Sequence, residues 1–295
     1  MNLIFRNKLE KAVYPNTYHG KGDSILFSAL FSGSPLQILY TFLALAIVLF
    51  TGIPFHEFAH GWTAERFGDR TARLSGRLTV NPFAHFDLFG TLMLFLVGVG
   101  FAKPVPINPN NFRGNKKVGI AVTALAGPLS NLIIAFLFVV LGRLVNLLYL
   151  LIGGDLAFYY IFIQVLFLAA QVNVGLAIFN LIPLPPLDGW RILGLVLPAK
   201  WQFFAMKYQY YIVLLLFVLL ATDILSTPLG IAQQWVLNLF SAITQPIATG
   251  FGLLVSARAS TNSTSTTSPS PSSWSSIWTT WPRCRAWIWR SPVNF

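Results

Sequence analysis

Long stretches without a charged side chain are the feature that most limits how this chain can fold. Four such runs are long enough to cross a bilayer, at residues 36–55, 118–142, 156–187 and 224–257. Uncharged apolar runs of about 18 or more residues are typical of transmembrane helices. Charged residues make up only 10% of the chain, against about 25% in soluble domains. We therefore expect an all-α polytopic membrane protein with about 5–6 transmembrane helices.

The charges that are present are mostly basic, and the formal net charge is +11. A basic surface can bind nucleic acid, but here the Lys and Arg residues gather in short loops between the apolar runs, at 65–77, 103–117 and 191–207. Basic loops of this kind stay on the cytoplasmic side of a membrane. The pattern therefore predicts the lipid bilayer as the surroundings and no nucleic-acid partner.

The composition also predicts a division of the chain into three parts. An N-terminal arm at 1–35 precedes a membrane domain at 36–255, and a low-complexity tail at 256–295 follows it. The tail contains STNSTSTTSPSPSS, a composition typical of disorder; its Trp-rich end suits either an interfacial anchor or a non-native extension. Within the domain, the uncharged run 88–102 is short for a span, so we expect a re-entrant element there.

The motif HEFAH ends the first apolar run and contains His56, Glu57 and His60. Histidines four residues apart on a helix project from one face and can bind one metal ion. Zinc accepts neutral imidazole, and Glu57 stands close enough to reach a metal-bound water, as in the H-E-x-x-H pattern of metalloproteases. Histidines on an apolar face also serve as ordinary core residues. However, an acid at membrane depth costs about 2.5–3.5 kcal/mol, which favours a shared task for the three residues.

A catalytic zinc site takes three protein ligands, so two histidines leave the set incomplete. Asp188 stands out because it ends the run 156–187 and follows proline-broken backbone, which at membrane depth lines a wet cavity or lies buried in protein. A plain Asp-Gly turn is the alternative interpretation of Asp188. The remaining acids and histidines near apolar runs, or outside the motif, are Asp87, Asp155, Asp223, His19 and His85.

Pro54 lies two residues before the motif. It has no N–H to donate to the carbonyl of Phe50, so we expect the helix to kink or restart just before His56.

Four segments occur in order between about residues 36 and 200: HEFAH, NPFAHFD, AGPLSN and NLIPLPPLDG. With them, the chain resembles the site-2 protease family of intramembrane zinc metalloproteases and looks most like its compact bacterial members. The resemblance implies His56 and His60 as zinc ligands, Asp188 as the third ligand and Glu57 as general base, with one Zn²⁺ per chain. It also implies that Asn180 positions the substrate backbone.

Two further residues are possible neighbours of this site. NPFAHFD matches the family's re-entrant element, which places His85 near the site. AGPLSN matches a small-residue helix between the two main motifs, where Asn131 faces the site while the small residues serve helix packing.

The function implied is a zinc-dependent endopeptidase that cleaves membrane proteins within or near their transmembrane segments, as in regulated intramembrane proteolysis. The resemblance implies the bacterial cytoplasmic membrane, and the basic loops predict an active site nearer its cytoplasmic side. A catalytically silent scaffold or chaperone and an ion-relaying transporter are the alternatives. The sequence predicts no particular oligomeric state.

Overall fold

The computed structural model describes residues 34–88, 90–92, 102–152, 155–221 and 224–261. Every regular element in these residues is a helix, which confirms the all-α class. Three helical segments are long and apolar enough to cross a membrane: Pro35–Arg66, Lys116–Tyr149 and Leu156–Asn180. The protein is therefore an integral, multi-pass membrane protein.

The first of these segments consists of two helices, α3 (Pro35–Phe50) and α4 (Gly52–Arg66). They meet at Thr51, whose φ of −121° and ψ of −66° are not helical. Pro54 lacks the N–H that a continuous helix would direct at the carbonyl of Phe50. The interruption predicted just before the histidine motif is thus confirmed.

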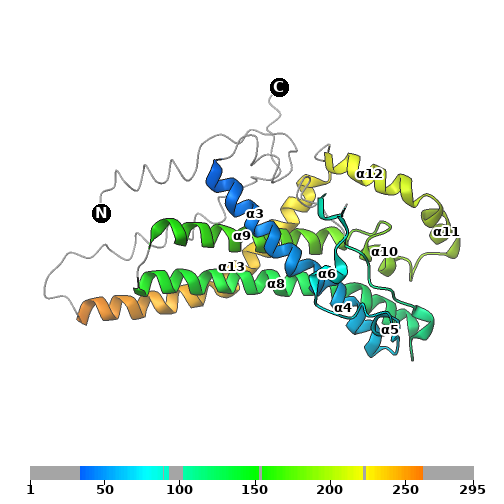
Figure 1. Cartoon of the computed structure of the whole chain (residues 1–295), viewed down its shortest axis with the longest axis horizontal. Helices are drawn as coiled ribbons and strands as arrows, with labels where there is room; N and C mark the ends of the chain where they lie inside the picture. The colour runs from blue at the N-terminus through cyan, green and yellow to red at the C-terminus, as the bar shows by residue number, and fades with distance from the viewer. Residues whose placement is uncertain (1–33, 89, 93–101, 153–154, 222–223, 262–295) are drawn as a thin grey trace, which may run out of the picture.

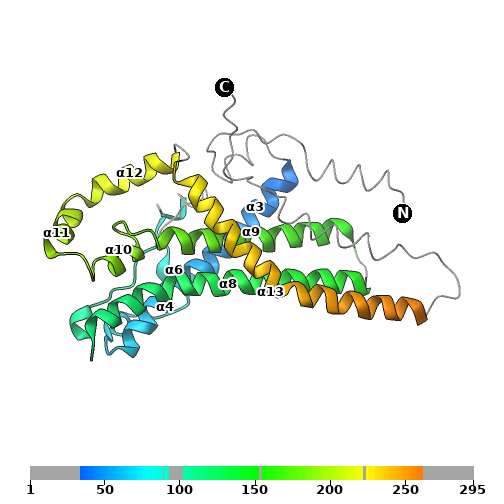
Figure 2. The same cartoon turned by 180° about the vertical axis from the view of Figure 1, so that it is seen from behind.

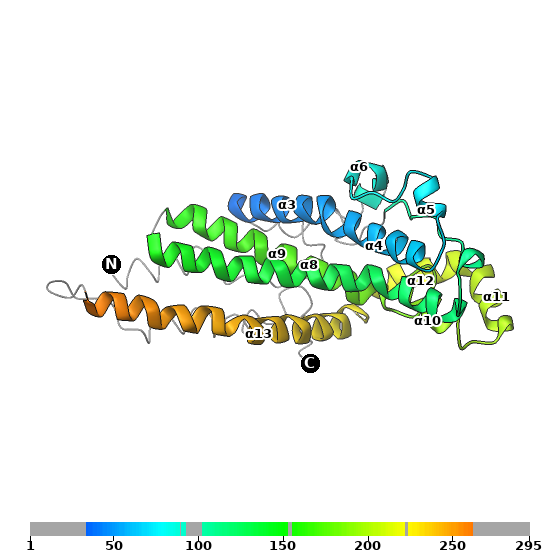
Figure 3. The same ribbon diagram turned by 90° about the horizontal axis from the view of Figure 1, so that it is seen from below.

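Two long helices, α8 (Lys116–Ile152) and α9 (Leu156–Asn180), form the middle layer of the bundle. Helices α3 and α4 cross one face of this layer (Figure 1), and α13 (Ser226–Thr261) crosses the opposite face (Figure 2). The view from below shows the three layers stacked in that order (Figure 3). The helix α4 packs on α8, and this contact places the histidine motif against the middle layer.

Buried apolar side chains fill the two spaces between the layers. One cluster joins α3 to α9 and the other joins α8 and α9 to α13. Each cluster contains two alanines, and small residues let helices approach closely where lipid supplies no hydrophobic driving force. The cluster members are Ala44, Leu45, Val48, Leu49, Val165, Leu168, Ala169, Val172 and Leu176, and then Ala135, Val139, Ala170, Val174 and Leu237.

A buried guanidinium also ties α13 to α8. Arg143 is only 3% exposed, and its Nη2 donates to the hydroxyl of Ser241 at 2.8 Å, while its Nε donates to that of Thr244 at 3.3 Å. Hydroxyl acceptors reduce the cost of burying this charge. The contact therefore fixes the register of α13 against α8.

Several shorter helices complete the described chain. Most lie at the end of the bundle where α4 ends (Figure 1). They are α5 (Thr71–Leu74), α6 (Pro82–His85), η1 (Pro109–Asn111), α10 (Asp188–Leu193), α11 (Ala199–Lys207) and α12 (Gln209–Ala221).

Some sequence expectations remain predictions. The total of about 5–6 spans exceeds the three segments identified. The re-entrant element predicted at 88–102 falls mostly on 93–101, outside the described residues. Helix α13 continues to Thr261, past the predicted domain end at residue 255, and the arm at 1–33 and the tail at 262–295 are not described.

Candidate metal centre and active site

Three buried side chains converge at one point between α4 and the start of α10. The Nε2 atoms of His56 and His60 lie 3.0 Å apart. Oδ2 of Asp188 lies 3.2 Å from the first and 3.1 Å from the second. The structure thus brings together two residues one helical turn apart and a third that follows 128 positions after His60. The convergence is the arrangement that the sequence predicts for a metal site.

Backbone and glycine contacts hold the two imidazoles. Nδ1 of His60 lies 2.7 Å from the carbonyl oxygen of Thr123 on α8. A carbonyl only accepts, so Nδ1 carries the proton and donates it, which leaves the Nε2 lone pair for the convergence point. Gly127, one turn further along α8, leaves room for the rings: a Cβ there would lie 2.3 Å from Nε2 of His60 and 2.7 Å from Cε1 of His56.

The third member is set by the turn before α10. Gly189, the next residue after Asp188, packs against the backbone of residues 181 and 182. A Cβ on Gly189 would lie 2.2 Å from the carbonyl oxygen of Leu181 and 2.6 Å from that of Ile182. Burial alone would raise the pKa of Asp188, but the two imidazoles beside its carboxylate hold that pKa well below its ordinary value. The aspartate therefore reaches the site as a carboxylate.

The donor set fits zinc. One nitrogen from each histidine and one carboxylate oxygen all lie within 4.8 Å of one another. Two imidazoles and one carboxylate are ligands of catalytic zinc sites, which keep a further position for water or substrate. The proton on Nδ1 of His60 and the glycine cradle at residue 127 are consistent with a preorganised site.

Glu57 lies beside this cluster and is not part of it. Its Oε2 accepts a hydrogen bond of 2.8 Å from the backbone N–H of Val105, a buried residue. The segment that carries Val105 is fixed on its other side, because the N–H of Lys103 donates to the carbonyl of His85 at 2.9 Å. Nη2 of Arg77 donates to the carbonyl of Lys103 at 2.6 Å. The carboxylate is therefore held by backbone from a distant part of the chain.

The other predicted site residues lie outside the metal cluster. Asn180 is the last residue of α9, and its amide donates to the carbonyl of Leu176 at 2.9 Å, a bond within its own helix. Asn131 is buried one turn beyond Gly127 on α8. His85 is fully buried, and its Nε2 lies 2.8 Å from the carbonyl of Thr79.

Comparison with known proteins agrees with this geometry. Residues 44–222 match the sequence model of Peptidase family M50. The chain belongs to peptidase family M50. This is the site-2 protease family that the motifs resemble, so the protein is a zinc-dependent intramembrane endopeptidase, and its substrates are membrane proteins. The comparisons favour neither of the two alternative functions.

The similar proteins include three from bacteria and an archaeon. The "putative zinc metalloprotease YwhC" of Bacillus subtilis is 40% identical over 69% of this chain and 93% of its own length. The "putative zinc metalloprotease Rip2" of Mycobacterium tuberculosis is 28% identical over 74% of this chain and 82% of its own. The "zinc metalloprotease MJ0392" of Methanocaldococcus jannaschii is 26% identical over 61% of this chain and 42% of its own length. No solved structure matches the chain.

Sequence reasoning missed the backbone partners in this site. The carbonyl of Thr123 and the N–H of Val105 orient His60 and Glu57. No side-chain pattern marks them, because every residue except proline offers the same two backbone groups. Gly127 carried a signal, as part of AGPLSN, but that signal indicated helix packing and not a contact with the histidines.

Proposed function

We propose that His56, His60 and Asp188 hold one zinc ion and that Glu57 is the general base and acid of peptide hydrolysis. The convergence of the three ligand atoms on one buried point carries this assignment. A zinc ion bound there would supply Lewis-acid polarisation of the scissile carbonyl and lower the pKa of a water molecule.

The hydrogen bond from Val105 gives the two carboxylate oxygens of Glu57 different roles. Oε2 accepts the backbone N–H, and Oε1 has no hydrogen-bond partner within the described part of the chain. Oε1 is therefore the atom that takes a proton from the attacking water as oxygen bonds to the carbonyl carbon. The same carboxyl group then gives that proton to the nitrogen of the departing amine as the C–N bond breaks.

Three further residues complete the proposed site. Asn180 binds the substrate backbone through its carboxamide oxygen, since its amide group is used within α9. His85 acts as a positioning residue, because its carbonyl holds Lys103, two residues before the donor to Glu57. Asn131 follows Gly127 by one helical turn and is proposed as a neighbour of the site, because its buried Oδ1 has no partner among the described residues.

We propose the bacterial cytoplasmic membrane as the location, with the catalytic end of the bundle facing the cytoplasm. The basic stretch at 65–77 follows directly after α4, the helix that carries the motif, and basic loops stay cytoplasmic. Five to six spans within residues 36–255 and a re-entrant element near 88–102 belong to the same proposal.

Two variants of full-length protein in detergent or nanodiscs test these roles. Glu57→Gln should keep about one zinc per chain and lose about 10²–10⁴-fold in cleavage of a model transmembrane substrate. Asp188→Asn should lose both zinc and cleavage. Asp155→Asn is the matched control, because an asparagine oxygen still caps α9. Substantial cleavage by Glu57→Gln, or full zinc retention by Asp188→Asn, would contradict the respective assignment.

A further inference from the structure

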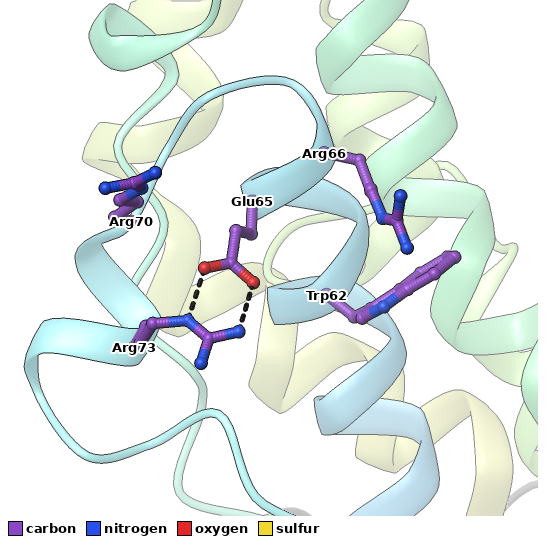
Figure 4. Close-up of a pocket in the computed structure, with 5 residues that line it drawn as sticks. All are labelled: Trp62, Glu65, Arg66, Arg70 and Arg73. Carbon is purple, nitrogen blue, oxygen red and sulfur yellow. Dashed lines mark hydrogen bonds and ion pairs between the residues drawn. The ribbon is translucent and has the colours of Figure 1, made fainter.

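An open cavity of about 550 Å³ lies where α4 ends (Figure 4). Trp62, Glu65 and Arg66 reach it from the last turns of α4, Arg70 from the following turn and Arg73 from α5. Its volume lies within the range of small-molecule sites, about 300–1,000 Å³. Four of its five lining side chains are charged, so it suits an ionic group and not an apolar ligand.

The cavity has three arginines and one glutamate among its lining residues, so its positive charges exceed its negative ones. Glu65 is committed to Arg73, which donates to both carboxylate oxygens, through Nη2 at 2.8 Å and through Nε. The guanidinium of Arg66 stacks over the ring of Trp62, 4.7 Å from its centre. Arg70 stands on the opposite side of Glu65 from Arg66 (Figure 4). Among the residues that the structure describes, no carboxylate pairs with Arg66 or Arg70.

The acid nearest in sequence does not supply the missing charge. Asp69 is fully buried, and its Oδ2 accepts the backbone N–H of Asn108 at 2.6 Å. Its Oδ1 accepts the side-chain amide of Asn111 at 2.9 Å and both the N–H and the hydroxyl of Thr71. The carboxylate is thus directed inward, to the loop at 108–111, and the arginines remain available to an external anion.

The cavity lies at the C-terminal end of the first candidate span. The candidate span Pro35–Arg66 ends at one of its lining residues. Trp62 is 45% exposed, and tryptophan is enriched at the level of lipid headgroups. Leu74, next to Arg73, is 84% exposed. Together, Trp62 and an exposed leucine beside arginines suit a surface that contacts lipid headgroups.

We propose that this cavity binds the phosphate group of an anionic phospholipid. Guanidinium forks bind phosphate oxygens through paired hydrogen bonds, and Arg66 and Arg70 present one such fork on each side of Glu65. The acyl chains would continue along α4 into the bilayer. The site is separate from the zinc ligands, so the proposal does not depend on the proposed catalytic roles.

The test measures lipid retention by native mass spectrometry. Full-length protein is released from nanodiscs that contain equal amounts of phosphatidylglycerol and phosphatidylcholine. Wild type should retain phosphatidylglycerol preferentially. The double variant Arg66→Gln/Arg70→Gln should retain at least about tenfold less phosphatidylglycerol than wild type. Arg191→Gln removes one exposed arginine outside the cavity and should retain lipid as wild type does.

A variant with the opposite expected effect distinguishes loss of the site from a general folding defect, because misfolding cannot increase lipid retention. Glu65→Gln frees the guanidinium of Arg73 and should increase phosphatidylglycerol retention. Unchanged retention in both Glu65→Gln and the double variant would overturn the proposal, as would equal retention of the two lipids by wild type. Displacement of the lipid by millimolar inorganic phosphate would identify a free-phosphate site instead. Preferential binding of an acidic peptide with no lipid preference would identify a protein-binding site instead.

Discussion

Gly127 lies directly against the imidazole of His60, so close that a Cβ on Gly127 would stand 2.3 Å from Nε2. Real Cβ contacts at this distance do not occur, and both partners sit on long, packed helices, α8 and α4. An added methyl group would therefore push the ring of the proposed ligand away from the convergence point. Gly127 therefore contributes to the proposed metal centre because its missing side chain leaves room for the imidazole of His60.

The first prediction follows from that contact. Gly127→Ala should lose most of its bound zinc and at least about 10–100-fold in activity, because contacts that orient ligands control metal affinity to this extent. Zinc content by mass spectrometry and cleavage of a model substrate measure the two effects. Gly142→Ala is the control: it makes the same change on the same helix, and beyond its chain neighbours and the adjacent helix backbone no atom lies within 4 Å of the new methyl group. Equal zinc content in the two variants would contradict the predicted clash.

The second prediction concerns the turn that presents Asp188. A Cβ on Gly189 would lie 2.2 Å from the carbonyl oxygen of Leu181, and backbone cannot yield as a flexible side chain does. Gly189→Ala should displace Asp188 and lower zinc content, with the fold of the bundle retained by circular dichroism. Gly194→Ala, six residues after Asp188, places its Cβ 3.2 Å from the nearest heavy atom and should keep zinc. A Gly189→Ala protein that still binds about one zinc per chain would contradict the prediction and would show that the turn accommodates the methyl group.

The proposed ligand set could be predicted from the sequence, while the backbone contacts and glycines that support it could not. Helical periodicity alone places His56 and His60 on one face of a helix. Pro54 predicted the interruption between α3 and α4 because the effect of its missing N–H is local. The partner of Glu57 is a peptide N–H brought from 48 residues away. Such a contact depends on tertiary folding and leaves no local pattern. The basic stretch at 65–77 indicated membrane orientation, but composition could not show that its arginines line a cavity.

The third prediction concerns metal removal. Because zinc would bind only the folded arrangement of His56, His60 and Asp188, its loss should lower the thermal midpoint. The corresponding free energy is about 4 kcal/mol where free zinc is 1,000-fold above the dissociation constant. Treatment with a chelator should abolish cleavage, and added zinc should restore both cleavage and the midpoint. Asp188→Asn should show little response to the chelator. A wild-type midpoint unaffected by chelation would contradict a site that couples binding to folding.

The fourth prediction concerns Asp69, which joins the end of α4 to the loop at 108–111. Burial alone would raise the pKa of Asp69, but hydrogen bonds from Thr71, Asn111 and Asn108 outweigh it and hold the pKa below its ordinary value. A lowered pKa means that the folded state prefers the carboxylate. Its contribution to stability is therefore complete above the unfolded-state pKa of about 3.9 and is lost as pH falls through the lower folded-state value.

Asp69→Asn replaces one acceptor oxygen by an amide that meets backbone or side-chain donors. At pH 7 this change should destabilise the protein by about 1–3 kcal/mol, the cost of unsatisfied buried groups. Thermal midpoints of wild type and variant, measured from pH 7 to well below the unfolded-state pKa of about 3.9, should begin to converge below that value, as acid protonates Asp69 in the wild type. Asp155→Asn, which keeps an acceptor at the start of α9, should stay near wild type at pH 7. A difference between wild type and Asp69→Asn that is the same at every pH would show that the network needs the oxygen atoms of Asp69 and not its charge.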